Sequence, residues 1–296
     1  MDYIKRDTNL YDTIHYVDYP YNIHGDIEGP QPESTNAVTA LGQIANTLIF
    51  DKSDSARTWG KAFSTLALIH IIGDFHQPLH ATSLFSKKWN FLLPFGDVGG
   101  NRFKINYVSE SGMTYKQIHL LYDCLGGLYC DYMPIVMTPE YEKQIREVTD
   151  TLMKEFPKEK YDPEILYPSN MFESKKKFTA AMEAWANESF ELSKPLYDQL
   201  TPNQTLTPEF ITELRAVLLE RVAIAGYRLA HVLEKINTTK VGPEPYLKER
   251  QLYRVVMIVT SLLFIVALVV ATIYKHLYNE SRAAAYMSFS TIQEDH

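Results

Sequence analysis

Three histidines and one aspartate lie within eleven residues of this chain, in the segment His70-Ile-Ile-Gly-Asp74-Phe-His76-Gln-Pro-Leu-His80. A second His-x-x-x-Asp pair, His119 and Asp123, follows further along. Residues four positions apart lie on one face of a helix, so each pair can direct both side chains to the same point. Neutral imidazole and carboxylate are the usual ligands of zinc where thiolates are absent. Together with His80 and an upstream His15, the pairs predict two zinc ions close together, an arrangement suited to phosphate ester hydrolysis.

A histidine on an apolar helix is more often a hydrogen-bonded core residue than a metal ligand. His70 and Asp74, however, interrupt an otherwise apolar run, Leu66-Ala-Leu-Ile-His-Ile-Ile. A carboxylate buried there without a partner would cost several kcal/mol. From the residues alone, a metal ion and a hydrogen-bonded core both explain how Asp74 is neutralised.

The order of these motifs resembles the class I nucleases, which are zinc-dependent single-strand nucleases and also act as 3'-nucleotidases. The resemblance covers residues 10–237, nearly all of the chain outside its apolar C-terminal segment. Its motifs are His15-Tyr-Val-Asp18, the segment 70–80, Gly99-Gly100-Asn101, the pair His119 and Asp123, and Gly226-Tyr-Arg-Leu-Ala230. It implies a mainly α-helical fold, with a single zinc-nuclease domain of the type shared by phospholipase C and these nucleases.

The resemblance also implies a ligand set for the zinc ions, of which the family binds three. Two groups of two histidines and one aspartate would hold two of the ions: His15, His70 and Asp74, and His80, His119 and Asp123. Asp74 would bridge to the third ion and is the residue expected to be catalytic. His76 matches the motif but would be structural, or would support the ligands, rather than bind metal.

Three further positions correspond to substrate-binding residues of the family. Tyr16 would stack on a base, Asp18 would hydrogen-bond the edge of that base, and Asn101 would help to shape the pocket. Stacking contributes about 1–3 kcal/mol and tolerates any base, so sequence preference should be weak. A base paired in a duplex cannot enter such a slot, which favours single strands. Ordinary packing is the alternative for Tyr16.

The third zinc site departs from the family pattern. In the family it uses an N-terminal Trp and a His five residues later, and another Asp ligand lies between that His and the His-x-x-Asp motif. This chain begins Met1-Asp-Tyr-Ile-Lys-Arg and contains none of them. A missing N-terminal segment and a naturally shortened protein are both possible explanations, so a catalytically impaired relative remains an alternative.

Composition narrows the choice of partners and compartment. The net charge of -7 argues against a broad basic footprint for duplex nucleic acid. Cys124 and Cys130 are the two cysteines, too few for a thiolate zinc site, and a disulfide between them is favoured over free thiols. Asn187, Asn203 and Asn237 begin Asn-x-Ser/Thr triplets and are candidate glycosylation sites.

The C-terminal part of the chain predicts a membrane anchor. Residues 255–274 carry no charge, and a helix of about 20 residues rises about 30 Å. We expect a nuclease domain over 1–240, a stalk over 241–254, one transmembrane helix over 255–274 and a cytoplasmic tail over 275–296. The flanking Lys and Arg residues mildly favour the opposite orientation. The resemblance to enzymes that act outside the cytoplasm instead places the domain on the extracellular or lumenal side.

Apolar spacing predicts helices over 38–50, 57–72, 140–156, 175–192 and 208–236. Thr138 and Thr207 precede prolines and are candidate N-caps. Alternation over 99–108 predicts a short strand, part of a β-hairpin. The domain is therefore expected to be mainly helical.

The function expected from these observations is a membrane-anchored zinc-dependent 3'-nucleotidase/nuclease. Its substrates would be 3'-nucleotides and single-stranded RNA or DNA, cleaved to 5'-nucleotides for purine salvage, and no protein partner is predicted. A zinc-dependent phospholipase C would share the helical fold and the three zinc ions, although Tyr16 and Asp18 speak against it. A non-catalytic surface protein that keeps two structural zinc ions is the third hypothesis.

Overall fold

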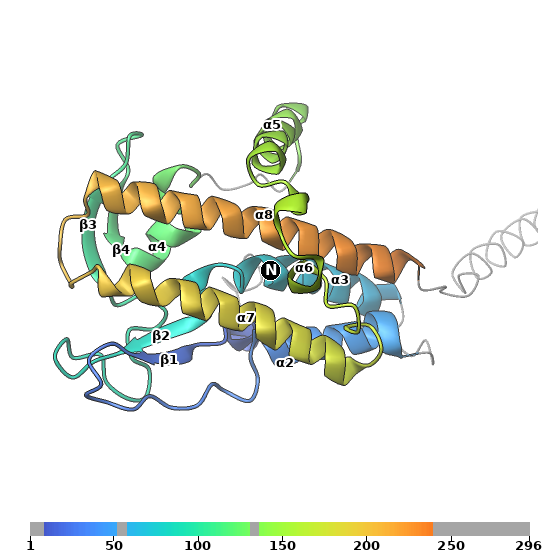
Figure 1. Cartoon of the computed structure of the whole chain (residues 1–296), viewed down its shortest axis with the longest axis horizontal. Helices are drawn as coiled ribbons and strands as arrows, with labels where there is room; N and C mark the ends of the chain where they lie inside the picture. Colours follow the sequence, from blue (N-terminus) through green and yellow to red (C-terminus); the bar gives the residue numbers. More distant parts are fainter. Residues whose placement is uncertain (1–8, 52–57, 131–135, 239–296) are drawn as a thin grey trace, which may run out of the picture. The chain divides into compact units, whose positions relative to one another are not determined.

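Long helices form the framework of the domain (Figure 1). The computed structural model describes residues 9–51, 58–130 and 136–238, which belong to one compact unit, Met1–Thr239. The longer helices are α2 (Ala37–Ala45), α3 (Thr58–Asp74), α5 (Pro139–Glu155), α7 (Lys175–Asp198) and α8 (Pro208–Thr238). Helix α2 packs against both α3 and α7, and α3 packs in turn against α8. The expectation of a mainly helical domain is confirmed for the described residues.

Shorter elements connect the long helices. They are the α-helices α4 (Ile118–Asp123) and α6 (Pro163–Leu166), the π-helix η2 (Asn46–Phe50), and the 3-10 helices η1 (Asn9–His15), η3 (Pro78–His80), η4 (Leu125–Gly127) and η5 (Lys158–Lys160). Two of these short elements, η3 and α4, carry predicted metal ligands, and η1 ends on another.

The helix ends follow local sequence signals. Thr138 accepts a hydrogen bond from the backbone N–H of Tyr141, and Thr207 accepts one from Phe210, which confirms both predicted N-caps. Helix α7 continues past its predicted end at residue 192 and through Pro195. It does so because Leu196 and Tyr197 are buried in the core on the far side of the proline, so tertiary packing overrides the local helix breaker.

The strands are short and form two separate pairs. Strand β3 (Lys104–Val108) pairs with β4 (Thr114–Gln117) in the predicted antiparallel hairpin. The predicted strand began at Gly99, but Gly99 and Gly100 have φ values of 55° and 84°, which strands do not adopt, so the strand begins later. A parallel pair of β1 (Tyr19–Asn22) and β2 (Thr82–Phe85) was not predicted. This second pair brings the chain around His15 beside the chain around His80.

Two large hydrophobic clusters form most of the core of the described residues, and each supports one of the predicted ligand pairs. The cluster around α2, α3 and α7 includes Leu68, Ile71 and Ile72 of α3, the helix that carries His70 and Asp74. The other cluster includes Leu121 and Tyr122 of α4, the helix that carries His119 and Asp123. Residues 74–80 therefore run from a helix of one core to the neighbourhood of the other.

Among the residues that the structure describes, no helix is both long and apolar enough to cross a bilayer. The predicted stalk 241–254, transmembrane helix 255–274 and tail 275–296 all lie outside those residues.

Candidate metal centre

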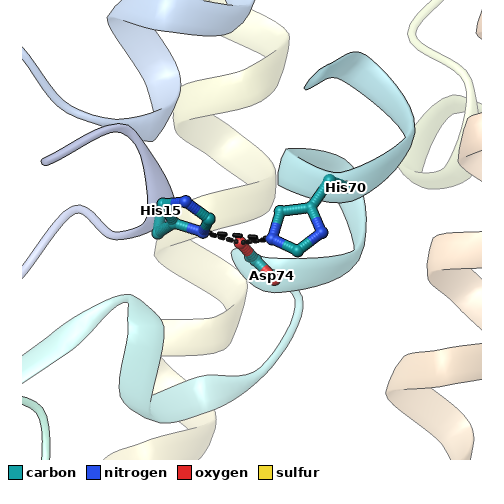
Figure 2. Close-up of side chains that lie close together, drawn as sticks. All are labelled: His15, His70 and Asp74. Carbon is teal, nitrogen blue, oxygen red and sulfur yellow. Dashed lines mark hydrogen bonds and ion pairs between the residues drawn. The ribbon is translucent and has the colours of Figure 1, made fainter. Parts of the chain in front are cut away.

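Three of the predicted ligands, His15, His70 and Asp74, converge on one point (Figure 2). His15 is the last residue of η1, and the other two occupy the last turns of α3, four positions apart. His15 Nδ1 lies 2.8 Å from Asp74 Oδ2, and His70 Nε2 lies 3.1 Å from both of those atoms. The i, i+4 spacing on α3 therefore directs two side chains to a third that is distant in sequence.

The donor set of this first group fits a zinc ion. Ligand atoms about 2.0–2.1 Å from a tetrahedral zinc lie about 3.3 Å from one another, so only a slight separation of the three atoms is needed. The His15 nitrogen that faces this point is Nδ1, whereas its Nε2 is buried without a hydrogen-bond partner among the described residues. Burial alone would raise the pKa of Asp74, but hydrogen bonds from His15 and His70 outweigh it and lower the pKa, which keeps the carboxylate ionised as a ligand must be.

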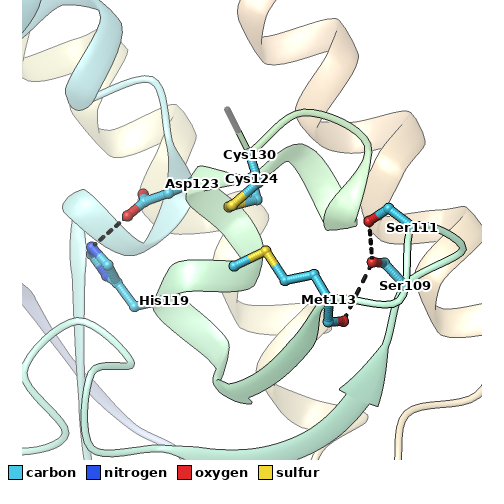
Figure 3. Close-up of a disulfide and its surroundings, with 7 residues drawn as sticks. All are labelled: Ser109, Ser111, Met113, His119, Asp123, Cys124 and Cys130. Carbon is cyan, nitrogen blue, oxygen red and sulfur yellow. Dashed lines mark hydrogen bonds and ion pairs between the residues drawn. A yellow bond between two sulfur atoms is a disulfide. The ribbon is translucent and has the colours of Figure 1, made fainter. Parts of the chain in front are cut away.

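The other three predicted ligands, His80, His119 and Asp123, form a second group. His80 Nε2 lies 3.5 Å from Asp123 Oδ1, and His119 Nε2 lies 3.4 Å from Asp123 Oδ2, the contact drawn in Figure 3. The two imidazoles are stacked with centroids 5.0 Å apart. Burial opposes the charge on His80, but the carboxylates of Asp123 and Asp74 raise the pKa of His80 to about 9 in the metal-free protein.

Backbone carbonyls orient both imidazoles of this second group. His80 Nδ1 lies 2.8 Å from the carbonyl oxygen of His15, and His119 Nδ1 lies 2.5 Å from that of Gly99. A carbonyl only accepts, so each Nδ1 carries the proton and each Nε2 is directed toward Asp123. Metal-binding histidines are held in this way by their other ring nitrogen.

Gln77 supports the second group, a role that the sequence analysis did not assign. Its Nε2 donates to Asp123 Oδ1 at 2.8 Å, and its Oε1 accepts from the backbone N–H of Leu79 at 2.5 Å. The side chain thus links the segment between the two groups to a predicted ligand. Its motif position was visible in the sequence, but its partner lies 46 residues away.

His76 lies in neither group. It is buried, its Nδ1 lies 2.7 Å from the carbonyl oxygen of Ile72, and its Nε2 accepts from Arg228 at 2.9 Å. Burial and the charges of Arg221 and Arg228 hold the pKa of His76 well below its usual value. It is therefore a neutral hydrogen-bonded residue, in line with the expectation that it is structural.

The predicted base-binding residues lie beside the second group. Asp18 has a φ of 57°, which is unusual for a residue other than glycine. The charge of His80 acts on the Asp18 carboxylate and favours its ionised form. Burial, and then the charge of Asp97, raise the pKa of Asp18 to about 7. Tyr16 is half-buried and interacts electrostatically with Asp18. Asn101 is exposed, and its side chain donates to the carbonyl of Val98 within its own turn.

Asp97 fixes the glycine-rich turn whose Gly99 carbonyl holds His119. The sequence analysis did not assign this role to Asp97 either. It is fully buried, and its carboxylate accepts from the Leu84 backbone at 2.8 Å and from the Tyr197 hydroxyl at 2.6 Å. Burial raises the pKa of Asp97 to about 6. In the same turn, a Cβ at Gly99 would lie 2.7 Å from the carbonyl oxygen of Leu79, so only glycine brings the Gly99 carbonyl to His119.

A disulfide joins Cys124 to Cys130 directly after Asp123, which confirms the predicted pairing (Figure 3). The bridge closes the turn that contains η4. In that turn Arg215 of α8 donates to the carbonyl of Gly126 at 3.0 Å. The C-terminal end of the second group is therefore tied covalently to the turn that follows it.

The asparagines of the three candidate glycosylation triplets are exposed.

An apolar cavity of about 240 Å³ lies between α3 and α8, and part of the segment that joins the two groups lines it. Its walls include Ile69 and Gly73 on α3, Val222 and Gly226 on α8, and Gln77 at the second group. The charged side chain among its lining residues, Arg221, is paired with Glu188. The cavity therefore presents a nonpolar surface rather than a row of positive charges.

Comparison with known proteins gives a consistent result. The profile of the S1/P1 nuclease family matches residues 1–238. Endonuclease 5 of Arabidopsis thaliana is 26% identical over 238 residues, covering 77% of this chain and 72% of the relative. Endonuclease 4 of the same plant is 24% identical over 238 residues, with 77% and 71% covered. Because the family match spans the whole region that holds both ligand groups, this chain belongs to the S1/P1 nuclease family and is a hydrolase of the nuclease class.

Proposed function

We propose that this chain is a membrane-anchored, zinc-dependent 3'-nucleotidase and single-strand nuclease. It would hydrolyse 3'-nucleotides, and cleave single-stranded RNA and DNA to 5'-nucleotides. The observation that carries the proposal is the convergence of two His-His-Asp groups, joined by residues 74–80, in a member of a nuclease family.

Zinc would be held by His15, His70 and Asp74 in one position and by His80, His119 and Asp123 in another. The chemistry that bound zinc supplies is activation of water and stabilisation of negative charge on the phosphate. Asp74 would keep its ionised carboxylate between two imidazoles, as its lowered pKa indicates. A third ion, shared through Asp74, is part of the proposal by family resemblance.

Tyr16 and Asp18 would bind the nucleoside beside the scissile phosphate. They flank Val17, whose backbone N–H donates to the carbonyl of His80 at 2.7 Å, so this short segment is fixed against the second group. Tyr16 would stack on the base, and Asp18 would hydrogen-bond its edge. Asn101 would border the same pocket on the adjacent turn. Recognition through one stacked base supports a single-stranded substrate.

The location follows from different observations. The apolar segment 255–274 supports a single-pass membrane anchor, with 1–240 as the catalytic domain, 241–254 as a stalk and 275–296 as a cytoplasmic tail. The disulfide supports an oxidising, extracellular or lumenal site for the domain. The side chains of Asn187, Asn203 and Asn237 are exposed, which is compatible with glycosylation there, although Ser189 of the first triplet is buried. An enzyme so placed would release nucleosides from external nucleic acid for purine salvage.

The test is phosphate release from 3'-AMP by the full chain in detergent, before and after chelation and with zinc added back. We expect chelation to abolish release and zinc to restore it. Single-stranded DNA should be cut under the same conditions, and a duplex of the same sequence should be cut far more slowly. Release that survives chelation, or its absence in the zinc-loaded protein, would overturn the proposal.

A zinc-dependent phospholipase C is the second candidate, favoured by the apolar cavity lined by His76 and Gln77 of the segment between the two groups. Gly226 lines the cavity and a Cβ there would meet no atom within 4 Å, so Gly226→Leu adds an apolar side chain at the cavity wall. If the substrate is a lipid, monomeric short-chain phosphatidylcholine should be hydrolysed, and the substitution should abolish that activity. If the substrate is a nucleotide, the wild-type protein should leave this lipid intact.

A further inference from the structure

Two arginines of α8 are buried together against one glutamate of α7. Arg228 is fully buried and Arg221 is 4% exposed. Arg228 donates to both carboxylate oxygens of Glu188 at 2.7 Å, and Arg221 donates to one of them at 3.0 Å. Buried charges are costly unless they are paired and hydrogen-bonded, and here one carboxylate serves two guanidinium groups. We call Glu188, Arg221 and Arg228 the buried arginine cluster.

Other groups of the cluster also have defined partners, although Arg228 Nε is buried without a hydrogen-bond acceptor among the described residues. Arg228 donates to the carbonyl of Ile165 at 2.9 Å and lies 4.6 Å from the ring centre of Trp185. Arg221 donates to the hydroxyl of Ser189 at 3.0 Å. These contacts hold both guanidinium groups in one orientation.

The same two arginines hold His76 by its side chain and by its backbone. Arg228 Nη1 donates to His76 Nε2 at 2.9 Å, and Arg221 Nε donates to the His76 carbonyl oxygen at 3.3 Å. A guanidinium group only donates, so His76 Nε2 accepts and Nδ1 carries the proton that is donated to Ile72. His76 therefore has one tautomer and one orientation, both set by the cluster.

His76 stands in the middle of the segment that joins the two ligand groups. Asp74 of the first group precedes it by two residues, and His80 of the second group follows it by four. The next residue, Gln77, donates to Asp123 of the second group. Fixing His76 therefore fixes the path of the chain between the two groups.

We propose that Glu188, Arg221 and Arg228 are positioning residues that set the spacing of the two metal-ligand groups by holding His76. The inference rests on the proposed zinc-dependent function. Stability alone is a weak reason for such a cluster, because apolar residues of similar volume often stabilise a core as well as a buried ion pair does. A role in holding residues 74–80 in place explains why charged donors are buried here and why they hydrogen-bond to His76.

The test compares Glu188→Gln with Leu152→Ala in the full-length protein. Leu152 packs on α8 in a small separate hydrophobic cluster, so its truncation lowers stability without touching the segment. Zinc affinity is measured by competition with a chromophoric chelator, well below the melting temperature of both variants, and the cobalt-substituted forms are compared by visible absorption. We expect Glu188→Gln to bind zinc about 10–100-fold more weakly and to show an altered cobalt spectrum. Leu152→Ala should match the wild type in both.

Equal zinc affinity in Glu188→Gln and the wild type would overturn the inference, as would an equal loss in Leu152→Ala. A wild-type protein that binds no zinc would overturn the proposed function as well, so the two failures are distinguishable.

A second pair of variants keeps the test informative if Glu188→Gln does not fold. Glutamine at position 76 can accept from Arg228 and donate to Ile72, whereas phenylalanine fills the space but offers no acceptor. We expect His76→Gln to retain zinc affinity within about tenfold of the wild type and His76→Phe to lose more, in line with the 10–100-fold losses typical of residues that support ligands. Equal affinities in the two variants would contradict the inference.

Discussion

The two ligand groups are built from the same residue types but differ in how far they are prepared for a metal. In the first group the ligand atoms lie 2.8–3.1 Å apart and are hydrogen-bonded to one another. In the second group, His80 Nε2 lies 3.5 Å from Asp123 Oδ1 and His119 Nε2 lies 3.4 Å from the other oxygen, Oδ2, each contact being close to the ligand spacing of about 3.3 Å around tetrahedral zinc. The first group must open to admit an ion, whereas the second begins with longer contacts.

The difference arises from the surroundings of each group. Both histidines of the second group are fixed through Nδ1 by backbone carbonyls, and its aspartate is held by Gln77 and followed by a disulfide. In the first group His15 and Asp74 are fixed mainly by each other, and His15 Nε2 has no partner in the described part of the chain. We therefore expect the second group to bind zinc first. Zinc binding at the first group should depend on the carboxylate of Asp74.

The largest expected effect comes from removing the charge at the first group. Asp74→Asn should lower kcat/KM for 3'-AMP by at least about 10³-fold, because the side chain would lose its ionised carboxylate and with it the metal that activates water. Steady-state phosphate release measures this. Asp150→Asn, on the exposed face of α5, is the matched control and should be unchanged. Activity within tenfold of the wild type in Asp74→Asn would show that the first group is not part of the active centre.

A smaller and more selective effect should follow from Gln77→Ala. The substitution removes the hydrogen bond to Asp123, and loss of such a supporting bond lowers metal affinity about 10–100-fold. Titration with cobalt, followed by visible absorption, should show that the tighter of the two binding steps has weakened while the weaker one is retained. Equal weakening of both steps would contradict the separate support of the two groups.

The pH dependence of the metal-free protein should also separate the groups. The pKa of His80 is raised to about 9, so its contribution to stability is complete below about pH 6.5 and is lost as the pH rises through 9. The pKa of Asp74 is lowered, so its contribution is present above its ordinary value of 3.8 and is lost as the pH falls below that value.

Chemical denaturation between pH 6 and 10 measures the alkaline part of this profile. The free energy of unfolding should fall by about 1–3 kcal/mol in the wild type and should change less in His80→Gln. An alkaline decline of the same size in both proteins would assign the titration to another group.

The smallest effect is expected from the disulfide. Replacing both cysteines in Cys124→Ser/Cys130→Ser should lower the free energy of unfolding by roughly 2 kcal/mol, the value expected for so short a loop. Because the bridge follows Asp123, zinc affinity at the second group should also fall, though less than tenfold. Thermal unfolding with and without zinc tests both effects. A greater loss of zinc affinity at the first group than at the second would contradict the comparison.

Much of the helical framework could be predicted from the sequence because its signals are local. Threonine N-caps before Pro139 and Pro208 mark helix starts, and the His70–Asp74 spacing places two side chains on one face of α3. The strand predicted from Gly99 began too early because alternation of residue types does not reveal backbone angles. The four-residue strands β1 and β2 were missed because each is too short to show a pattern.

The residues that support the site could not be predicted because their partners are distant in sequence. Asp97 meets Tyr197 100 positions later, and Arg228 meets His76 across 152 positions. The residue types gave no hint of these pairings, since a lone Asp or Arg is usually exposed. The candidate ligands were visible in the sequence because zinc chemistry restricts both residue type and local spacing.

The most direct test of the metal centre is a crystal structure of the zinc-soaked protein with anomalous diffraction data on both sides of the zinc absorption edge. We predict one anomalous peak among His80, His119 and Asp123, and another among His15, His70 and Asp74. If only one ion binds at limiting zinc, it should occupy the second group. Peaks elsewhere on the protein, or none at either group at saturating zinc, would contradict the assignment of these six residues as a zinc centre.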